Sequence, residues 1–209
     1  MMWQKTRWLR YLACAAIGCT AVWALIAMAK PVDEVVLTLG EPYEQVRAQS
    51  HSTLPPLEVG AAWGGVVTRP ARFQFTDPEH GFITPAAKFL TVGYDKHGNV
   101  WSVTLSPQVE TLPLKEALAA ILDLQDQLRR HGWHPIRADE FPPVSNTPAM
   151  VESIRRGDDP QSFWQVAGKY QVFLDIRRFT HENRPEDERY LITLQLSGPP
   201  LMEDHLDVN

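Results

Sequence analysis

The alternation of apolar and polar positions predicts several strands. The strongest signals cover residues 170–177 and 190–197, where apolar side chains alternate with polar ones. Residues 89–105 predict a hairpin, because two β-rich runs flank the turn sequence DKHGN. In that turn Asp95 can cap its own backbone and Gly98 supplies a positive φ. Shorter apolar runs within residues 35–39 and 61–75 predict further strands.

A helical period appears most clearly over residues 112–131. Its apolar stripe consists of Leu114, Leu118, Ile121 and Leu128. Gly132 is suited to end this helix in the left-handed conformation. A second helix is predicted for residues 42–50, with Pro42 in its first turn. A short third helix would use Thr147 as its cap, Pro148 as its first residue and Gly157 as its stop.

These elements predict the fold class α+β. Strands joined by hairpins favour an antiparallel sheet of about five strands, with two or three helices packed on one face as a second layer. We assign this two-layer domain to residues 30–198. The remaining residues, 199–209, are expected to form a disordered tail.

Residues 11–29 contain neither a charge nor a proline. As a helix these nineteen residues would reach about 28 Å, close to the ~30 Å hydrocarbon core of a bilayer. Lys5, Arg7 and Arg10 precede the segment, so the positive-inside rule places the N-terminus in the cytoplasm. We therefore expect residues 1–29 to form a cytoplasmic N-terminus and a transmembrane signal anchor. The protein would be a single-pass bacterial inner-membrane protein with its C-terminal domain in the periplasm.

Two alternatives to an uncleaved anchor stay open. Ala27-Met28-Ala29 fits the small-x-small pattern of a cleavage site, and cleavage there would free the domain. A lipoprotein signal would use Cys14 or Cys19, but neither follows a leucine at the third position before it. Both cysteines lie in this segment, so residues 30–209 contain no disulfide, no Cys-based metal site and no Cys nucleophile.

The charge of the exported part favours a protein partner over a nucleic acid. The chain carries 20 basic and 25 acidic residues, a net charge of −5. Residues 1–29 hold three of the basic residues and no acid, which leaves −8 for residues 30–209. Binding to phosphates needs surplus Lys and Arg, so no nucleic-acid partner is expected. The acidic balance would steer a basic protein toward the domain, or only keep it soluble.

Candidate catalytic chemistry is sparse. His131 and His134 lie near two acids, but Gly132 breaks the helix between them, so they do not share a helical face. The hydroxyls on either side of His51 carry little weight, because a nucleophile and its base meet through the fold. No G-x-S-x-G, phosphate-binding loop or dinucleotide fingerprint is present. We expect no enzyme activity, no cofactor and no metal site.

The string Gly40-x-Pro42-x-Glu44-Gln45-Val46 resembles the opening of small bacterial envelope domains of the SmpA/BamE type. That resemblance implies a helix packed on a sheet. In general plan, an anchor followed by a small acidic domain, the chain resembles membrane-anchored periplasmic immunity proteins of type VI secretion effectors. The second resemblance implies neutralisation of a cognate toxin by occlusion.

We therefore expect a binding protein tethered to the inner membrane through residues 11–29, with a toxin as its partner. The alternative is an envelope-assembly or secretion-apparatus subunit that docks onto a membrane protein complex. Acidic loops would steer the partner and an exposed tryptophan would anchor it. The expected partner-binding residues are Asp139, Glu140, Asp158, Asp159, Glu182, Glu186, Asp187, Glu188 and Trp133.

Overall fold

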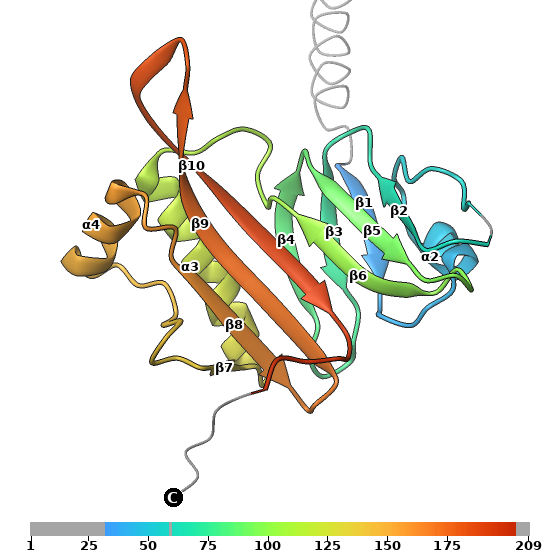
Figure 1. The fold of residues 1–209 in the computed structure, drawn as a ribbon. Coiled ribbons are helices and arrows are strands. Elements are labelled where there is room, and N and C mark those ends of the chain that lie inside the picture. Colours follow the sequence, from blue (N-terminus) through green and yellow to red (C-terminus); the bar gives the residue numbers. More distant parts are fainter. Residues whose placement is uncertain (1–31, 59, 204–209) are drawn as a thin grey trace, which may run out of the picture. The chain divides into compact units, whose positions relative to one another are not determined.

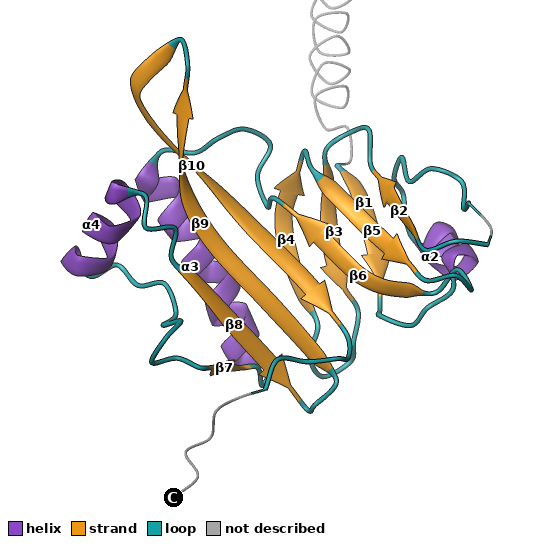
Figure 2. Ribbon diagram, in the orientation of Figure 1, coloured by secondary structure: helices purple, strands orange, loops and turns teal. Residues whose placement is uncertain are grey.

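The computed structural model describes residues 32–58 and 60–203, which form ten strands and three helices (Figure 1, Figure 2). The helices are α2 (Tyr43–Gln49), α3 (Leu114–Arg130) and α4 (Pro148–Arg156). The strands are β1 (Asp33–Leu37), β2 (Trp63–Val66), β3 (Ala71–Phe75), β4 (Phe82–Ala87), β5 (Leu90–Tyr94), β6 (Val100–Leu105), β7 (His134–Ile136), β8 (Gln161–Val166), β9 (Tyr170–His181) and β10 (Arg184–Ser197).

The strands form two sheets. The larger has seven strands in the order β2-β5-β6-β10-β9-β8-β7, and every pair in it is antiparallel. The smaller has three strands in the order β1-β3-β4, and β1 runs parallel to β3. Since β10 pairs with both β9 and β6, it joins strands from the two halves of the chain.

The predicted fold class is wrong. The described residues are mostly β-sheet, with ten strands in two sheets and a parallel pair, where the sequence predicted one antiparallel sheet of about five strands. The missed strands carry weak local signals, because β2 and β7 are only four and three residues long and Pro85 lies inside β4. Parallel pairing of β1 with β3 has no hairpin signature and depends on contacts distant in sequence.

The core lies on one face of the seven-stranded sheet. Leu194 of β10 is paired with Leu105 on one side and Leu174 on the other, and all three are fully buried. Helix α3 contacts β9, β10 and β4, so it shares this core with the three-stranded sheet. Full burial of a Leu or Phe side chain contributes about 1.5–3 kcal/mol. The alternation of apolar and polar side chains along β9 and β10 therefore determines which face of the large sheet is buried.

The opposite face of the large sheet carries polar and aromatic side chains. Side chains that are paired across β10, β9 and β8 form rows on this face, and one row consists of Gln195, Phe173 and Phe163. Ser197, Gln171 and Gln165 form the next row. These residues are half-buried or exposed, as expected for the solvent side of an antiparallel sheet.

No helix among residues 32–58 and 60–203 has both the length and the apolar character needed to cross a membrane. The longest of them, α3, has 17 residues and carries charged side chains along one side, such as Lys115, Asp123 and Arg130. This finding contradicts the predicted inner-membrane localisation, the signal anchor and the periplasmic placement of the domain. The segment predicted to span the membrane, residues 11–29, lies outside the described residues.

An aromatic cluster joins α2 to the large sheet. The ring of Tyr94 lies 5.6 Å from that of Tyr43 and stacks on Trp63 at 5.3 Å. Tyr43 donates its hydroxyl hydrogen bond to the Pro55 carbonyl at 3.0 Å. The hydroxyl of Tyr94 is buried and has no hydrogen-bond partner among the described residues, and this burial raises the pKa of Tyr94.

These two tyrosines should respond oppositely to removal of the hydroxyl. Tyr94→Phe is expected to raise the free energy of unfolding by about 1 kcal/mol, because it deletes a buried polar group without a partner. Tyr43→Phe is expected to lower it by about 1 kcal/mol, because it leaves the Pro55 carbonyl without its donor. Urea unfolding of both variants measures the difference. Equal destabilisation by the two changes would contradict this account of Tyr94.

Candidate functional site

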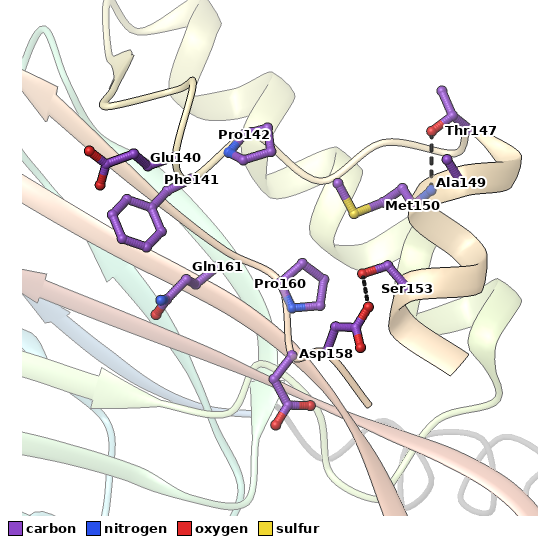
Figure 3. Close-up of a pocket in the computed structure, with 11 residues that line it drawn as sticks. Glu140, Phe141, Pro142, Thr147, Ala149, Met150, Ser153, Asp158, Pro160 and Gln161 are labelled. Atoms are coloured by element: carbon purple, nitrogen blue, oxygen red, sulfur yellow. Dashed lines mark hydrogen bonds between the residues drawn. The ribbon is translucent and has the colours of Figure 1, made fainter. Parts of the chain in front are cut away.

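A cleft of about 470 Å³ lies beside α4 (Figure 3). One wall is the loop before α4, the second is α4 itself, and the third is the segment that enters β8. The lining residues are Glu140, Phe141, Pro142, Thr147, Ala149, Met150, Ser153, Asp158, Asp159, Pro160 and Gln161. Apolar surface and acidic groups therefore occur together in one cleft.

Local sequence signals position the walls of this cleft. Thr147 caps α4 by accepting a hydrogen bond from the Met150 amide, and Pro148 occupies the first turn. Gly157 ends the helix with φ 82°. Asp159 follows with φ 47°, a conformation that Asp tolerates better than most residues. Two left-handed residues within three positions turn the chain sharply from α4 into β8.

The apolar part of the cleft continues onto the solvent face of the sheet. The ring of Phe141 packs edge-on against Phe163 at 5.1 Å, and Phe163 packs against Phe173 at 5.3 Å. The guanidinium of Arg137 lies over the Phe141 ring at 5.1 Å. These contacts hold Phe141 in place, so the aromatic surface is already formed in the structure.

The three acids of the cleft differ in how they are neutralised. Asp158 accepts hydrogen bonds from Arg156 at 2.5 Å and from Ser153 at 2.8 Å, and these bonds lower the pKa of Asp158. Glu140 pairs with Arg137. Asp159 takes part in no hydrogen bond or ion pair within the part of the chain that the structure describes. Its charge is therefore available to a partner.

The fold brings together two of the three predicted acidic loops. Glu140 comes from the loop before α4, and Asp158 and Asp159 come from the loop after it, so both loops line one cleft. Asp139 is exposed beside them but does not line the cleft.

The third acidic loop belongs to the β9–β10 hairpin, away from the cleft lining. Arginines neutralise part of it, with Arg155 bonded to Glu188 at 3.1 Å and Arg189 bonded to Asp187 at 2.8 Å. Hydrogen bonding to Tyr190 and then to Arg155 lowers the pKa of Glu188. Glu182 and Glu186 are exposed on the same hairpin. This loop is therefore a separate surface in which two of the four predicted acids are paired with arginines.

Trp133 is not available to a partner. It is 2% exposed and donates its indole hydrogen bond to the His80 carbonyl at 3.0 Å. Its ring lies 6.0 Å from Phe82 and stacks on Tyr170 at 6.3 Å. The sequence does not distinguish a core tryptophan from an interface one. Trp101, at 53% exposure, lies on the surface.

The three histidines that the sequence singled out lie apart in the fold: His51 lies beside Asp33, His134 pairs with Gln165 of β8, and His131 follows α3. His131 Nδ1 lies 2.9 Å from the Gln127 carbonyl, as expected for a residue that caps the end of α3. Among residues 32–58 and 60–203, no group of three or more His, Cys, Asp or Glu side chains could hold a metal ion.

Sequence reasoning missed the apolar lining of the cleft, chiefly Phe141, Met150 and Pro160. Phe141 lies in an irregular, proline-rich stretch without periodicity, so no pattern marked it. In β8, Gln161, Phe163 and Gln165 alternate with the buried residues Ser162, Trp164 and Val166. This alternation could have predicted a strand there.

Comparisons with protein-family models, with curated proteins and with solved structures each returned no match. The resemblances to SmpA/BamE-type envelope domains and to immunity proteins therefore stay predictions.

Asp175 on β9 pairs in register with Gln161, which lines the cleft, and the carboxyl of Asp175 makes the stability of the fold depend on pH. Burial is the main cause that raises the pKa of Asp175, and the charge of Asp159 adds to it. The Thr193 amide donates a hydrogen bond to Asp175 at 3.1 Å and acts in the opposite direction. A carboxyl whose pKa is raised in the folded state destabilises the fold as pH rises through and above its usual range.

Asp175→Asn is therefore expected to stabilise the domain at neutral pH. The amide oxygen can still accept from Thr193, while the half-buried charge is removed. The gain should vanish near pH 3, below the usual Asp pKa of about 3.9, because the carboxyl is then protonated in both states. Thermal unfolding at several pH values measures this gain, with exposed Asp123→Asn as the control. A gain independent of pH would contradict the assigned cause.

Proposed function

We propose that the domain acts by binding another protein at the cleft beside α4, as an immunity protein that occludes a toxin. One observation carries the proposal. Acids from the two loops that flank α4 line a single cleft together with Phe141 and Met150. Acidic groups around an apolar patch suit a partner segment with a basic residue beside an apolar one.

The charge pattern defines the partner further. Asp158 and Glu140 already have arginine partners, whereas Asp159 has none among the described residues. A lysine or arginine of the partner would pair with Asp159, and an apolar neighbour would contact Phe141 and Met150. The net charge of −8 over residues 30–209 would speed the approach of a basic partner.

Occlusion requires no chemistry from this chain. A bound protein of ordinary interface size covers about 800 Å² on each partner. The cleft would therefore fix the register, and the surrounding surface would cover the toxin's functional site. Most of the specificity would come from Asp159 and the aromatic surface.

A second candidate is a subunit that docks permanently onto a protein complex, and a different surface favours it. Trp101 of β6 is half-exposed on the large sheet, and a Cβ at Gly93 would lie 2.9 Å from its indole nitrogen. Val66 on the edge strand β2 is 44% exposed. Such exposed apolar groups suit a lasting interface.

The immunity proposal is tested by co-expression with the product of the neighbouring reading frame. That product should arrest growth alone, and this protein should restore growth. Asp159→Asn should weaken the complex roughly tenfold, because one cross-interface ion pair is lost. Glu152→Gln, an exposed acid of α4 outside the cleft lining, is the matched control and should have no effect.

Opposite results separate the candidates. If Trp101→Ser abolishes binding and Asp159→Asn does not, the sheet face is the interface and the docking-subunit function is favoured. If loss of the protein harms growth with no toxin present, the immunity function is wrong.

A further inference from the structure

Residues 198–203 lie against the solvent face of the large sheet, at the ends of β8 and β9 (Figure 1). Two glutamine side chains hold Met202 by its backbone. Gln165 Nε2 donates to the Met202 carbonyl at 2.6 Å, and the Met202 amide donates to Gln171 Oε1 at 2.8 Å. The two glutamines also bond each other at 3.0 Å. We call Gln165 and Gln171 the glutamine clamp.

The clamp binds backbone groups in the way a neighbouring strand would. It offers one donor and one acceptor to the carbonyl and the amide of the same residue. Such contacts accept any non-proline residue in an extended segment. The Met202 side chain adds a contact, with its sulfur 3.8 Å from Arg137 Nη1. The chemistry is therefore that of a site for an extended peptide with a flexible apolar side chain.

The chain's own segment is held lightly. Pro199, Pro200 and Glu203 are exposed, and Leu201 and Met202 are only half-buried. Met202 is held by hydrogen bonds to the side chains of Gln165 and Gln171, whereas backbone ladder hydrogen bonds join β9 to β10. Segments with few buried contacts open locally at low cost.

The clamp adjoins the cleft. Arg137, which contacts Met202, also pairs with Glu140 and lies over Phe141, and both of these line the cleft. Gln165 and Gln171 lie two residues from Phe163 and Phe173 on the same strands and the same face. The cleft, the aromatic row and the clamp therefore form one continuous strip.

We infer that the glutamine clamp is a peptide-binding site whose resident ligand is the chain's own segment Gly198–Glu203, and that an extended segment of the partner displaces it. Displacement by the partner rests on the proposed function, whereas binding of the chain's own segment does not. The resident segment occupies one end of the strip, so it competes with a partner that enters through the cleft.

The resident ligand is tested in the full chain by amide hydrogen exchange at Met202. The Met202 amide should exchange at least about tenfold more slowly than in an unstructured peptide, and Gln171→Ala should remove that protection. Gln195→Ala, an exposed glutamine on the same face, should leave it unchanged. An unprotected Met202 amide in the wild-type protein, or protection that survives Gln171→Ala, would overturn the assignment.

Competition is tested with Met202→Pro, which removes the amide donor and the sulfur contact to Arg137 and leaves all residues of the clamp and the cleft unsubstituted. Affinity for the toxin should rise at least threefold, and Leu201→Ala should leave it unchanged. Unchanged or weaker affinity in Met202→Pro would overturn the competition. That result differs from failure of the proposed function, in which Asp159→Asn has no effect on binding.

Discussion

The pairing of β10 with strands from both halves of the chain is the interaction on which the structure depends. Leu194 meets Leu105 of β6 on one side and Leu174 of β9 on the other, and Leu196 meets Val103 and Val172 in the same way. Without β10 the hairpin β5–β6 would separate from β7, β8 and β9. The large sheet has one continuous buried face only because β10 joins these strands. Helix α3 and the three-stranded sheet share the core on that face.

The cleft follows from how this sheet ends. The edge strand β7 has three residues and pairs only with Phe163–Gln165 of β8, so the first residues of β8 lack a strand on that side. Helix α4 and its flanking loops lie beside this unpaired part, as Figure 3 shows. An open sheet edge invites association with other chains, and here loops and a helix surround it. The lining of the cleft and the protection of the sheet edge therefore come from the same segments.

Arginines organise the electrostatics around α4. Arg155 bonds Glu188 of the hairpin, Arg156 bonds Asp158, and Arg137 bonds Glu140. Exposed pairs of this kind contribute little stability, typically up to about 1 kcal/mol each. They do decide which acids keep an uncompensated charge. Asp158 has an arginine partner and Asp159 has none among the described residues, although the two acids are adjacent and identical in the sequence.

The sequence by itself determined the elements whose signals are local. Helix α3 was expected at 112–131 and spans Leu114–Arg130, α4 begins after its Thr147 cap and ends at Gly157, and the β5–β6 hairpin lies within residues 89–105. Capping, periodicity and turn chemistry act within a few residues, so they can be read from a short stretch. The acidic loops on both sides of α4 were also recognised in this way.

Only the tertiary structure decided how those elements combine. The second sheet, the parallel pair β1–β3 and the central position of β10 depend on partners distant in sequence, which no local pattern specifies. The same holds for Trp133, which is buried, and Trp101, which is exposed, although both are tryptophans among mixed neighbours. The two acidic loops line one cleft because the sheet ends beside α4. Met202 bonds Gln165 and Gln171 because the pairing of β8 with β9 brings these two side chains together. These features have one physical reason in common. The burial of a side chain and the pairing of a strand depend on the packing of the whole domain, whereas a local stretch of sequence specifies only the properties of its own residues.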